Sequence, residues 1–404
     1  MKRLFILVIL TTLLSMGCGT EEVEEKPIEE NGDDLVKQKE DLNFVVEPKY
    51  DEADWFSDGY AMVGIDNTYG YIDGEGKEIV ELKFDDASSF SEGFGAVKLD
   101  DKWGYINEEG EYLVEPKYDN AHDFKNGLAK IELDGKKGVI NKQGDYVIEP
   151  TYDFIWVGSG DMIGVSDFDK GAGFTNRDGD IVIDLKFDSV SLFSEGLAKV
   201  QCKEEGKYGF INKEGEYVIE PKFDSARSFS DGIVPVGIKN LVEKEENVKE
   251  EVELWGVIDK SGEYVIEPEF KSISNFKGGI APATNMKGEY GFIDESGEYI
   301  FKLESDSSDH FKDGVARNKS TEGKWGFINK KGEFIIEPDY EMAWPYKEGE
   351  ELIQVRTTDE QWIVYDLDGD IKFKLDSEVA LGRISEGKAS VFIDEKIGFI
   401  EINK

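Results

Sequence analysis

The chain has 404 residues, with 47 basic and 88 acidic side chains and a formal net charge of −41. A surface this negative argues against nucleic acid as a partner, because phosphate binding requires a cationic surface. Hydrophobic residues make up 39% of the chain and aromatic residues 12%, which is too apolar a composition for a disordered polyanion. Only two Cys and two His are present, so neither a disulfide framework nor a His/Cys zinc site is expected.

Residues 1–17 have the layout of a signal peptide for export. Lys2-Arg3 gives a short cationic start, the apolar run 4–14 follows, and small residues lead to Gly17. As a helix of about 1.5 Å per residue, the run spans under ~20 Å, short of the ~30 Å hydrocarbon core of a membrane. We therefore interpret the segment as a cleaved signal and not as a permanent membrane span.

The Gly17-Cys18 junction is similar to the cleavage site of bacterial lipoproteins, in which the Cys becomes the lipid-modified first residue. An ordinary cleaved signal with an incidental Cys is the alternative. Residues 18–41 carry many charges and few apolar side chains, so they predict a lipidated Cys18 followed by an acidic, flexible tether. This interpretation places the protein on a bacterial cell membrane, held by a lipid anchor and facing outside the cytoplasm.

Residues 42–404 consist of one unit repeated ten times. Aromatic-Gly steps, or their equivalents, end at positions 70, 104, 138, 173, 209, 256, 291, 326, 363 and 398, at intervals of 34 to 37 residues with a single interval of 47. The long interval contains a charged insertion at 239–253, which we expect to be a lengthened hairpin loop.

Each unit predicts short β-strands, because its segments are four to six residues long, rich in Val, Ile, Tyr and Trp, and bounded by Gly or Pro. Asn107-Glu108-Glu109-Gly110 fits a tight hairpin turn in which Gly takes the positive φ. The pair Glu115-Pro116 recurs in most copies, and we expect the proline to end each strand since it donates no ladder hydrogen bond.

These motifs resemble the WG-repeat family of bacterial proteins. The segments that carry the resemblance are Lys102 to Asn107, Lys324 to Asn329 and the later Glu-Tyr-Val-Ile-Glu-Pro segment, and it extends over about residues 43–404. Two copies depart from the pattern: Ala172 replaces the aromatic residue in the fourth, and Ile363 replaces the Gly in the ninth. The resemblance implies an all-β repeat architecture, often on exported proteins, and no particular activity.

We favour an open, solenoid-like β-superhelix in which each unit stacks on its neighbours. One or two β-propellers are the alternative, because the array opens on a Glu-Pro strand (44–48) and closes on an aromatic-Gly strand (397–402). Those two pieces would complete a unit if they paired. Ten units exceed the usual four to eight blades, and about 35 residues is short for four strands.

Residue types that recur in most copies are expected to build the unit rather than to perform chemistry. This applies to one register of Phe and one of Tyr, for which we expect core positions. The Phe register holds Phe90, Phe124, Phe193, Phe229, Phe276 and Phe311, and the Tyr register holds Tyr112, Tyr146, Tyr217, Tyr264 and Tyr299. Trp156, Trp344 and Trp362 lie outside the register or in degenerate copies, so they are better candidates for a contact surface.

No motif predicts catalytic, metal or cofactor chemistry. His122 and His310 occupy different positions in their copies and have no Ser or Cys nucleophile motif around them. Cys202 lies on a predicted strand (197–202) and is interpreted as a half-buried free thiol. The Asp366-to-Asp370 segment falls where every copy has its Asn/Asp-x-x-Gly turn, so turn chemistry is favoured over calcium binding.

Two functional hypotheses remain. The first is a non-enzymatic lipoprotein that acts at the cell surface as a binding or scaffold module for a protein or cell-wall component, with cationic partners favoured by the negative field. The second is an exported enzyme, for example one acting on polysaccharides, with its site in the degenerate fourth or ninth copy.

Overall fold

The computed structural model describes residues 35–243, 249–304, 308–347 and 349–402. Contacts between residues divide the chain into two units, 1–34 and 35–404, and only the second is described here. The predicted signal peptide, Cys18 and most of the predicted tether lie outside the described residues.

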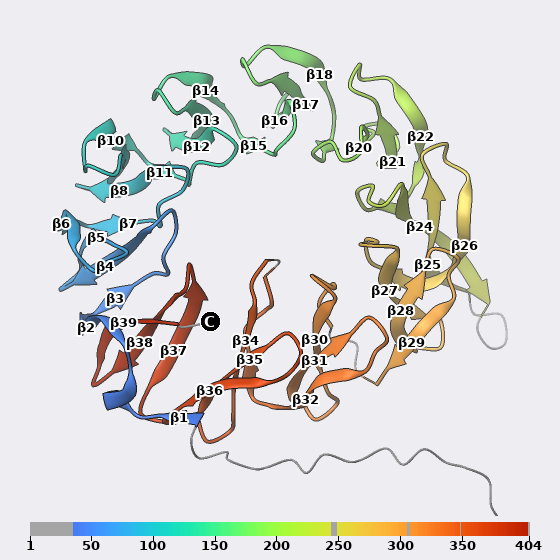
Figure 1. Ribbon diagram of the computed structural model, residues 1–404. Helices are drawn as coiled ribbons and strands as arrows, with labels where there is room; N and C mark the ends of the chain where they lie inside the picture. Colours follow the sequence, from blue (N-terminus) through green and yellow to red (C-terminus); the bar gives the residue numbers. More distant parts are fainter. Residues whose placement is uncertain (1–34, 244–248, 305–307, 348, 403–404) are drawn as a thin grey trace, which may run out of the picture. The chain divides into compact units, whose positions relative to one another are not determined.

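Within the described residues, the second unit consists of nine sheets, which are antiparallel apart from the β1–β36 pair. One seven-stranded sheet spans two copies of the repeat, and we call the ten copies blades 1 to 10. Figure 1 shows them arranged around a ring, with β6, β10, β14, β18, β22 and β26 along its outer margin. Blades 1 to 6 and blade 9 each begin with a strand of two or three residues and end with a longer strand.

The strands of the first five blades are as follows. Blade 1 holds β3 (Glu52–Ala53), β4 (Tyr60–Ile65), β5 (Thr68–Asp73) and β6 (Glu78–Phe84); blade 2 holds β7 (Asp86–Ala87), β8 (Gly95–Leu99), β9 (Lys102–Ile106) and β10 (Tyr112–Tyr118); blade 3 holds β11 (Asn120–Ala121), β12 (Leu128–Leu133), β13 (Lys136–Asn141) and β14 (Tyr146–Tyr152). Blade 4 holds β15 (Phe154–Trp156), β16 (Met162–Asp167), β17 (Gly171–Asn176) and β18 (Ile181–Phe187); blade 5 holds β19 (Ser189–Val190), β20 (Ala198–Gln201), β21 (Tyr208–Ile211) and β22 (Tyr217–Phe223).

The remaining blades vary this plan. Blade 6 holds β23 (Ser225–Ala226), β24 (Ile233–Glu243), β25 (Lys249–Asp259) and β26 (Tyr264–Ile273), and β26 continues into blade 7, which adds β27 (Ile280–Asn285), β28 (Tyr290–Asp294) and β29 (Tyr299–Leu303). Blade 8 holds β30 (Val315–Lys319), β31 (Trp325–Asn329) and β32 (Phe334–Tyr340); blade 9 holds β33 (Met342–Ala343), β34 (Leu352–Arg356), β35 (Trp362–Asp366) and β36 (Ile371–Leu375). Blade 10 combines β37 (Ala380–Ser385), β38 (Lys388–Ile393) and β39 (Lys396–Glu401) with β2 (Phe44–Tyr50) from the other end of the chain.

The predicted hairpin turn at Asn107 is confirmed. Gly110 has φ +78°, its N–H donates to the Asn107 carbonyl at 3.0 Å, and the Asn107 side-chain oxygen accepts from the N–H groups of Glu109 and Glu111 at 3.1 and 2.9 Å. An Asn at the first turn position thus satisfies two backbone donors that the hairpin would otherwise leave unpaired.

The proline of the Glu-Pro pair does not end its strand, and that prediction was wrong. Pro116 lies inside β10, where the ladder to β9 is interrupted: Val114 pairs with Tyr105 and Tyr118 pairs with Trp103. Between these two pairs, β10 runs over four residue positions and β9 over only two, so the extra residues of β10 form a bulge. A bulge on an outer strand tolerates proline, because the missing N–H is not needed for the ladder.

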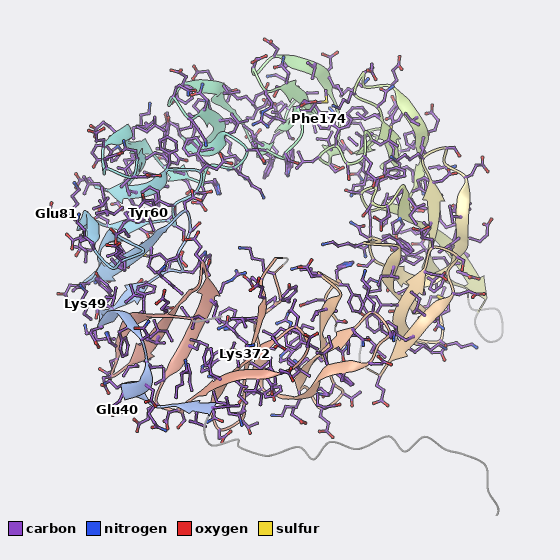
Figure 2. The ribbon with its side chains drawn as sticks, in the orientation of Figure 1. Glu40, Lys49, Tyr60, Glu81, Phe174 and Lys372 are labelled. Carbon is purple, nitrogen blue, oxygen red and sulfur yellow. The ribbon has the colours of Figure 1, made fainter. Side chains whose placement is uncertain are left out.

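The Phe register packs the blades against one another, as predicted. The ring centroids of Tyr105 in blade 2 and Phe124 in blade 3 lie 5.1 Å apart, and the Tyr105 hydroxyl donates to the His122 carbonyl at 2.7 Å. Phe124 is 1% exposed. The Tyr register is only half-buried, so these side chains cover the core instead of filling it. In Figure 2, Phe174 lies within its blade and Lys49 and Glu81 lie at the outer margin.

Three polar contacts recur between successive blades. Ser91 Oγ donates to the Phe124 carbonyl at 2.7 Å, and the Glu92 carboxylate accepts the N–H of Gly127 at 2.8 Å. Lys136 pairs at 2.6 Å with Asp153, which also accepts the Phe168 N–H at 2.7 Å. These contacts hold each blade against the blade that follows it in the chain.

The same three contacts join the last blade to the first. Ser385 Oγ donates to the Phe56 carbonyl at 2.8 Å, the Gly59 N–H donates to Glu386 at 3.0 Å, and Lys396 pairs with Asp51. The junction between blades 10 and 1 is therefore built like an internal junction.

Strand pairing closes the unit in the same register. The closing pairs are Phe44–Ile400, Val46–Phe399 and Tyr50–Ile397, and their counterparts in blade 2 are Tyr112–Ile106, Val114–Tyr105 and Tyr118–Trp103. The all-β repeat architecture is confirmed. Within it, the paired terminal strands correspond to the alternative that we considered, a propeller, and not to the open superhelix that we favoured.

Two predicted boundaries need correction. Residues 36–41, which we assigned to the tether, belong to the folded unit: β1 (Val36–Lys37) pairs in parallel with β36, and the short 3₁₀ helix η2 (Lys39–Asp41) follows. The insertion at 239–253 is largely strand rather than loop, because β24 and β25 pair from Ile233–Asp259 out to Glu243–Lys249.

The Lys136–Asp153 pair predicts a pH-dependent stability. Hydrogen bonds from Lys136 and from the Phe168 N–H hold the pKa of Asp153 below its ordinary value. The stabilisation is therefore present above about pH 4, where the carboxylate is ionised in the unfolded chain as well, and is lost as the pH falls through the folded pKa. We expect Asp153→Asn to lower the Tm at pH 7 and the difference from the parent chain to shrink progressively as the pH falls below about 4. A difference that does not shrink between pH 5 and pH 2 would contradict this assignment.

Candidate functional site

In each copy, the two residues directly before the position of the Phe register vary widely in type. They range from Gly and Ser to Trp, Arg and His, although most residues of the Phe register are buried. The ten pairs are Asp54-Trp55, Ser88-Ser89, His122-Asp123, Trp156-Val157, Ser191-Leu192, Arg227-Ser228, Ser274-Asn275, Asp309-His310, Trp344-Pro345 and Gly382-Arg383. Positions that do not build the unit are free to carry function, so we call them the variable pairs.

The variable pairs of blades 9, 10 and 1 line a hollow of about 620 Å³. Trp344 comes from blade 9, Arg383 from blade 10 and Trp55 from blade 1. The two tryptophans keep 40% and 42% of their surface exposed. A space of this volume with aromatic and polar walls is of the size that small ligands occupy.

Gly382, in the variable pair of blade 10, leaves the centre of this hollow open. At Gly382, a Cβ would collide with the Ser390 hydroxyl, so a side chain there requires that hydroxyl to rotate away. Beneath it lies Gln354, which is 6% exposed; its amide N–H donates to the Gly382 carbonyl at 2.8 Å and its amide oxygen accepts the Ile384 N–H at 3.0 Å. The hollow therefore has a fixed, polar floor.

Charged side chains stand around the hollow. Arg383 pairs with Glu350 at 3.0 Å and its guanidinium lies 5.6 Å from the centre of the Trp55 ring. Lys312 donates to the Tyr346 carbonyl at 2.9 Å. Lys347, on the same rim, is exposed.

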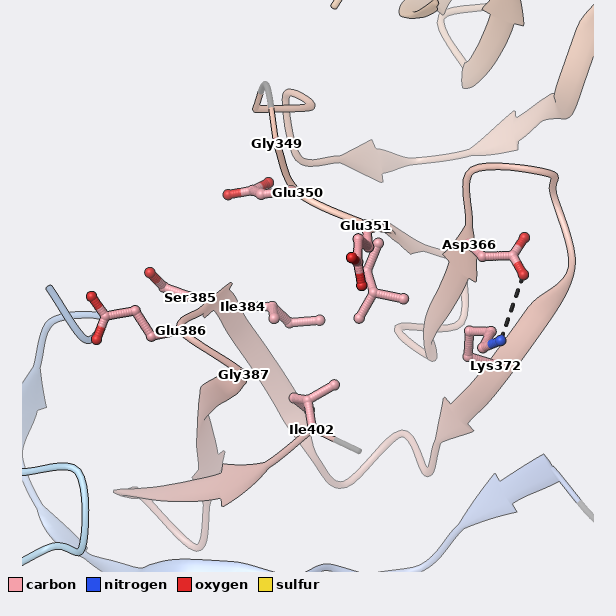
Figure 3. Close-up of a pocket in the computed structure, with 11 residues that line it drawn as sticks. Gly349, Glu350, Glu351, Asp366, Lys372, Ile384, Ser385, Glu386, Gly387 and Ile402 are labelled. Atoms are coloured by element: carbon pink, nitrogen blue, oxygen red, sulfur yellow. Dashed lines mark ion pairs between the residues drawn. The ribbon is translucent and has the colours of Figure 1, made fainter. Parts of the chain in front are cut away.

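A second cavity of about 350 Å³ lies beside it, between blades 9 and 10 (Figure 3). At this junction the usual pair of aromatic rings is missing, because Ile384 holds the place of the Phe register and Val364 that of its partner. Figure 3 shows Ile384 and Ile402 on the blade 10 side, facing Asp366 and Lys372, which pair at 3.6 Å. The cavity thus lies where smaller side chains replace the aromatic pair of a repeated packing position.

Sequence comparison identifies the repeat. The WG containing repeat family model matches nine segments: 40–69, 69–103, 103–136, 138–167, 173–207, 208–241, 255–285, 290–325 and 325–362. The chain belongs to the WG-repeat family. The nine matches start before β3 and end in β35, and the tenth blade of this WG-repeat protein is assembled from both ends of the array.

Other comparisons are distant. No curated protein sequence matches the chain. Similar solved structures include the computationally designed Ika8 protein (12% identity, TM-score 0.39, 70% of this chain and 95% of that one) and BamB from Moraxella catarrhalis (12%, 0.36, 80% and 98%). A eukaryotic initiation factor is similar over 80% of this chain and 86% of that one, at 11% identity and a TM-score of 0.43. At these values the likeness carries no argument about function.

The glycine of the WG pair is required by the bulge that faces it. A Cβ on Gly209 would lie 2.6 Å from the Ile219 carbonyl oxygen and 2.8 Å from the Pro221 nitrogen. In the ninth copy, Ile363 and Val364 pair directly with Lys374 and Phe373, without that bulge. The copy that lacks the glycine thus also lacks the bulge that the glycine faces in blade 5.

The three candidate tryptophans have different environments. Trp156 and Trp344 are exposed on the variable pairs of blades 4 and 9, and Trp156 stacks on the exposed Phe154 with 6.1 Å between ring centroids. Trp362 is only 4% exposed, so its assignment to a contact surface was wrong. It lies in a core cluster with Val364 of its own blade and Leu381 of blade 10.

The histidines and the cysteine are not brought together. His122 lies in blade 3 and His310 in blade 8; burial and Arg227 lower the pKa of His310, whose ring nitrogen lies 3.4 Å from Ser274 Oγ. Cys202 follows β20 as a half-buried free thiol, as predicted. Within the described ranges, no group of three His, Cys, Asp or Glu side chains has metal-binding geometry.

Asp366 confirms the turn interpretation of its segment. Its carboxylate accepts the N–H groups of Asp368 and Asp370 at 3.1 and 2.9 Å, just as Asn107 does in its own turn. A search of the described part of the chain found no helix with the length and apolar character needed to cross a membrane.

Sequence reasoning missed Trp55, Gly382, Arg383 and Gln354. An alignment of the ten copies could have indicated the first three, since each departs from its register. Gln354 could not be found in this way, because its role depends on the backbone of the neighbouring blade.

Proposed function

We propose that this WG-repeat protein is exported, held in the cell membrane by a lipid on Cys18, and acts as a non-enzymatic binding or scaffold module at the cell surface. The observation that supports the binding role is the hollow of about 620 Å³, where three adjacent variable pairs depart from an otherwise uniform repeat. Lys2-Arg3, the apolar run and Gly17-Cys18 support export and lipidation.

Anchoring is tested by fatty-acid labelling of the full chain in a bacterial host. We expect label in the membrane fraction for the parent chain, and an unlabelled, unprocessed chain for Cys18→Ser. Equal labelling of both would contradict lipidation of Cys18.

Binding is tested by capture from cell-surface extract at low salt, because the charge of −41 makes association salt-sensitive. We expect captured material that is lost with Trp344→Ala and retained with Trp156→Ala, an exposed tryptophan at the same register position in blade 4. Capture of nothing above control would contradict the binding role.

A further inference from the structure

The hollow between blades 9, 10 and 1 differs in charge from the rest of the molecule. Its lining includes the cations Lys312, Lys347 and Arg383 and the carboxylates Asp54 and Glu350, so its local balance is positive in a chain of charge −41. Because salt screens charges beyond about 8 Å at physiological ionic strength, the nearest groups decide what enters. This site therefore favours an anionic group, although the chain as a whole attracts cations.

Lys347 is the cation available to such a group. Arg383 is held by Glu350, and Lys312 donates to a backbone carbonyl. The Lys347 ammonium has no hydrogen bond or ion pair with any residue in the part of the chain that the structure describes. An incoming carboxylate could pair with it without displacing any of the described residues.

The side chains that line the walls and floor of the hollow indicate the chemistry of the rest of the ligand. Trp55 and Trp344 present exposed indole rings, which bury flat apolar surfaces well, while the floor offers the Ser390 hydroxyl and the backbone around Gly382. A pyranose ring combines these demands, because one face carries C–H groups and its edge carries hydroxyls. A hydrocarbon ligand would leave the polar floor unpaired.

We propose that this hollow binds a saccharide that carries a carboxylate, with a sugar ring against Trp55 and Trp344 and the carboxylate on Lys347. This proposal rests on the proposed binding function and specifies the class of ligand that the module binds.

The test is calorimetric titration of the full chain, solubilised in mild detergent, with three probes: trigalacturonate, the neutral trisaccharide maltotriose and the acidic peptide hexaglutamate. We expect trigalacturonate to bind at least about tenfold more tightly than maltotriose, the factor that one charge-assisted hydrogen bond provides. Hexaglutamate should not bind, because it offers no flat apolar face to the tryptophans.

Variants locate the site. Lys347→Gln is a surface change that should weaken trigalacturonate about tenfold and leave maltotriose unaffected, and Trp344→Ala should weaken both sugars. Trp156→Ala is the matched control and should change neither. Circular dichroism checks the fold of each variant, and Lys347→Gln keeps the test valid if Trp344→Ala unfolds.

Three results would contradict the proposal of a saccharide ligand: no binding of trigalacturonate at millimolar concentration, hexaglutamate binding as tightly as the sugar, or trigalacturonate binding that Lys347→Gln leaves unchanged. If these occur while extract capture still depends on Trp344, the binding role stands and only the ligand class is wrong.

Discussion

A chain that begins at residue 51, and therefore lacks β1 and β2, is expected to lose about 3–6 kcal/mol of unfolding free energy. Val46 and Tyr50 are 6% and 2% exposed, and each contributes roughly 1.5–3 kcal/mol through burial. The truncation also makes β39 an edge strand, paired on one side only, with β38. Chemical denaturation followed by tryptophan fluorescence measures the effect.

The matched control begins at residue 35 and keeps both strands. We expect its denaturation midpoint to equal that of the chain beginning at residue 19, since residues 1–34 form a separate unit. If the chain from residue 51 were as stable as the chain from residue 35, the terminal pairing would not contribute to the fold.

Gly209→Ala is expected to destabilise the protein by about 1–3 kcal/mol, the usual cost of forcing an extra group into a packed site. The new methyl would lie 2.6 Å from the Ile219 carbonyl oxygen, a backbone atom that a side-chain rotation cannot move away. Thermal unfolding followed by circular dichroism checks this.

Gly160→Ala provides the comparison, because a Cβ at Gly160 meets nothing within 4 Å. Its Tm should remain close to that of the parent chain. Equal losses in both variants would mean that the contact with the bulge is not the cause, because the effect of Gly→Ala on the entropy of the unfolded chain is stabilising.

Local features of the repeat were predictable because their causes are local. The turn at Asn107 depends on four consecutive residues, and the Phe register follows from a constant spacing of about 35 residues. The position of Pro116 was misjudged for the opposite reason: the bulge that accommodates it is created with Gly104 of the preceding strand.

The closure and the hollow depend on contacts between distant residues. Phe44 meets Ile400 across almost the whole chain, and the spacing of the copies alone was compatible with open and closed arrays. The hollow arises because Gly382 stands between two tryptophans from different blades, which requires the order of blades around the closure to be known. Trp362 was misplaced because the core that buries it includes residues of the next blade, such as Leu381 and Val391, which its own copy does not contain.

The pairing of β2 with β39, which we call the seam, places the two ends of the folded unit in one blade. The contacts that recur at the other junctions join this blade to blade 1. The chain could thus be circularly permuted: new ends cut between blades 4 and 5, with the old ends linked, would preserve every junction. The seam also fixes the copy number. An open array can gain or lose a repeat during evolution, but here a gene duplication or deletion of one unit would separate β2 from its partner, so selection acts on all ten copies together.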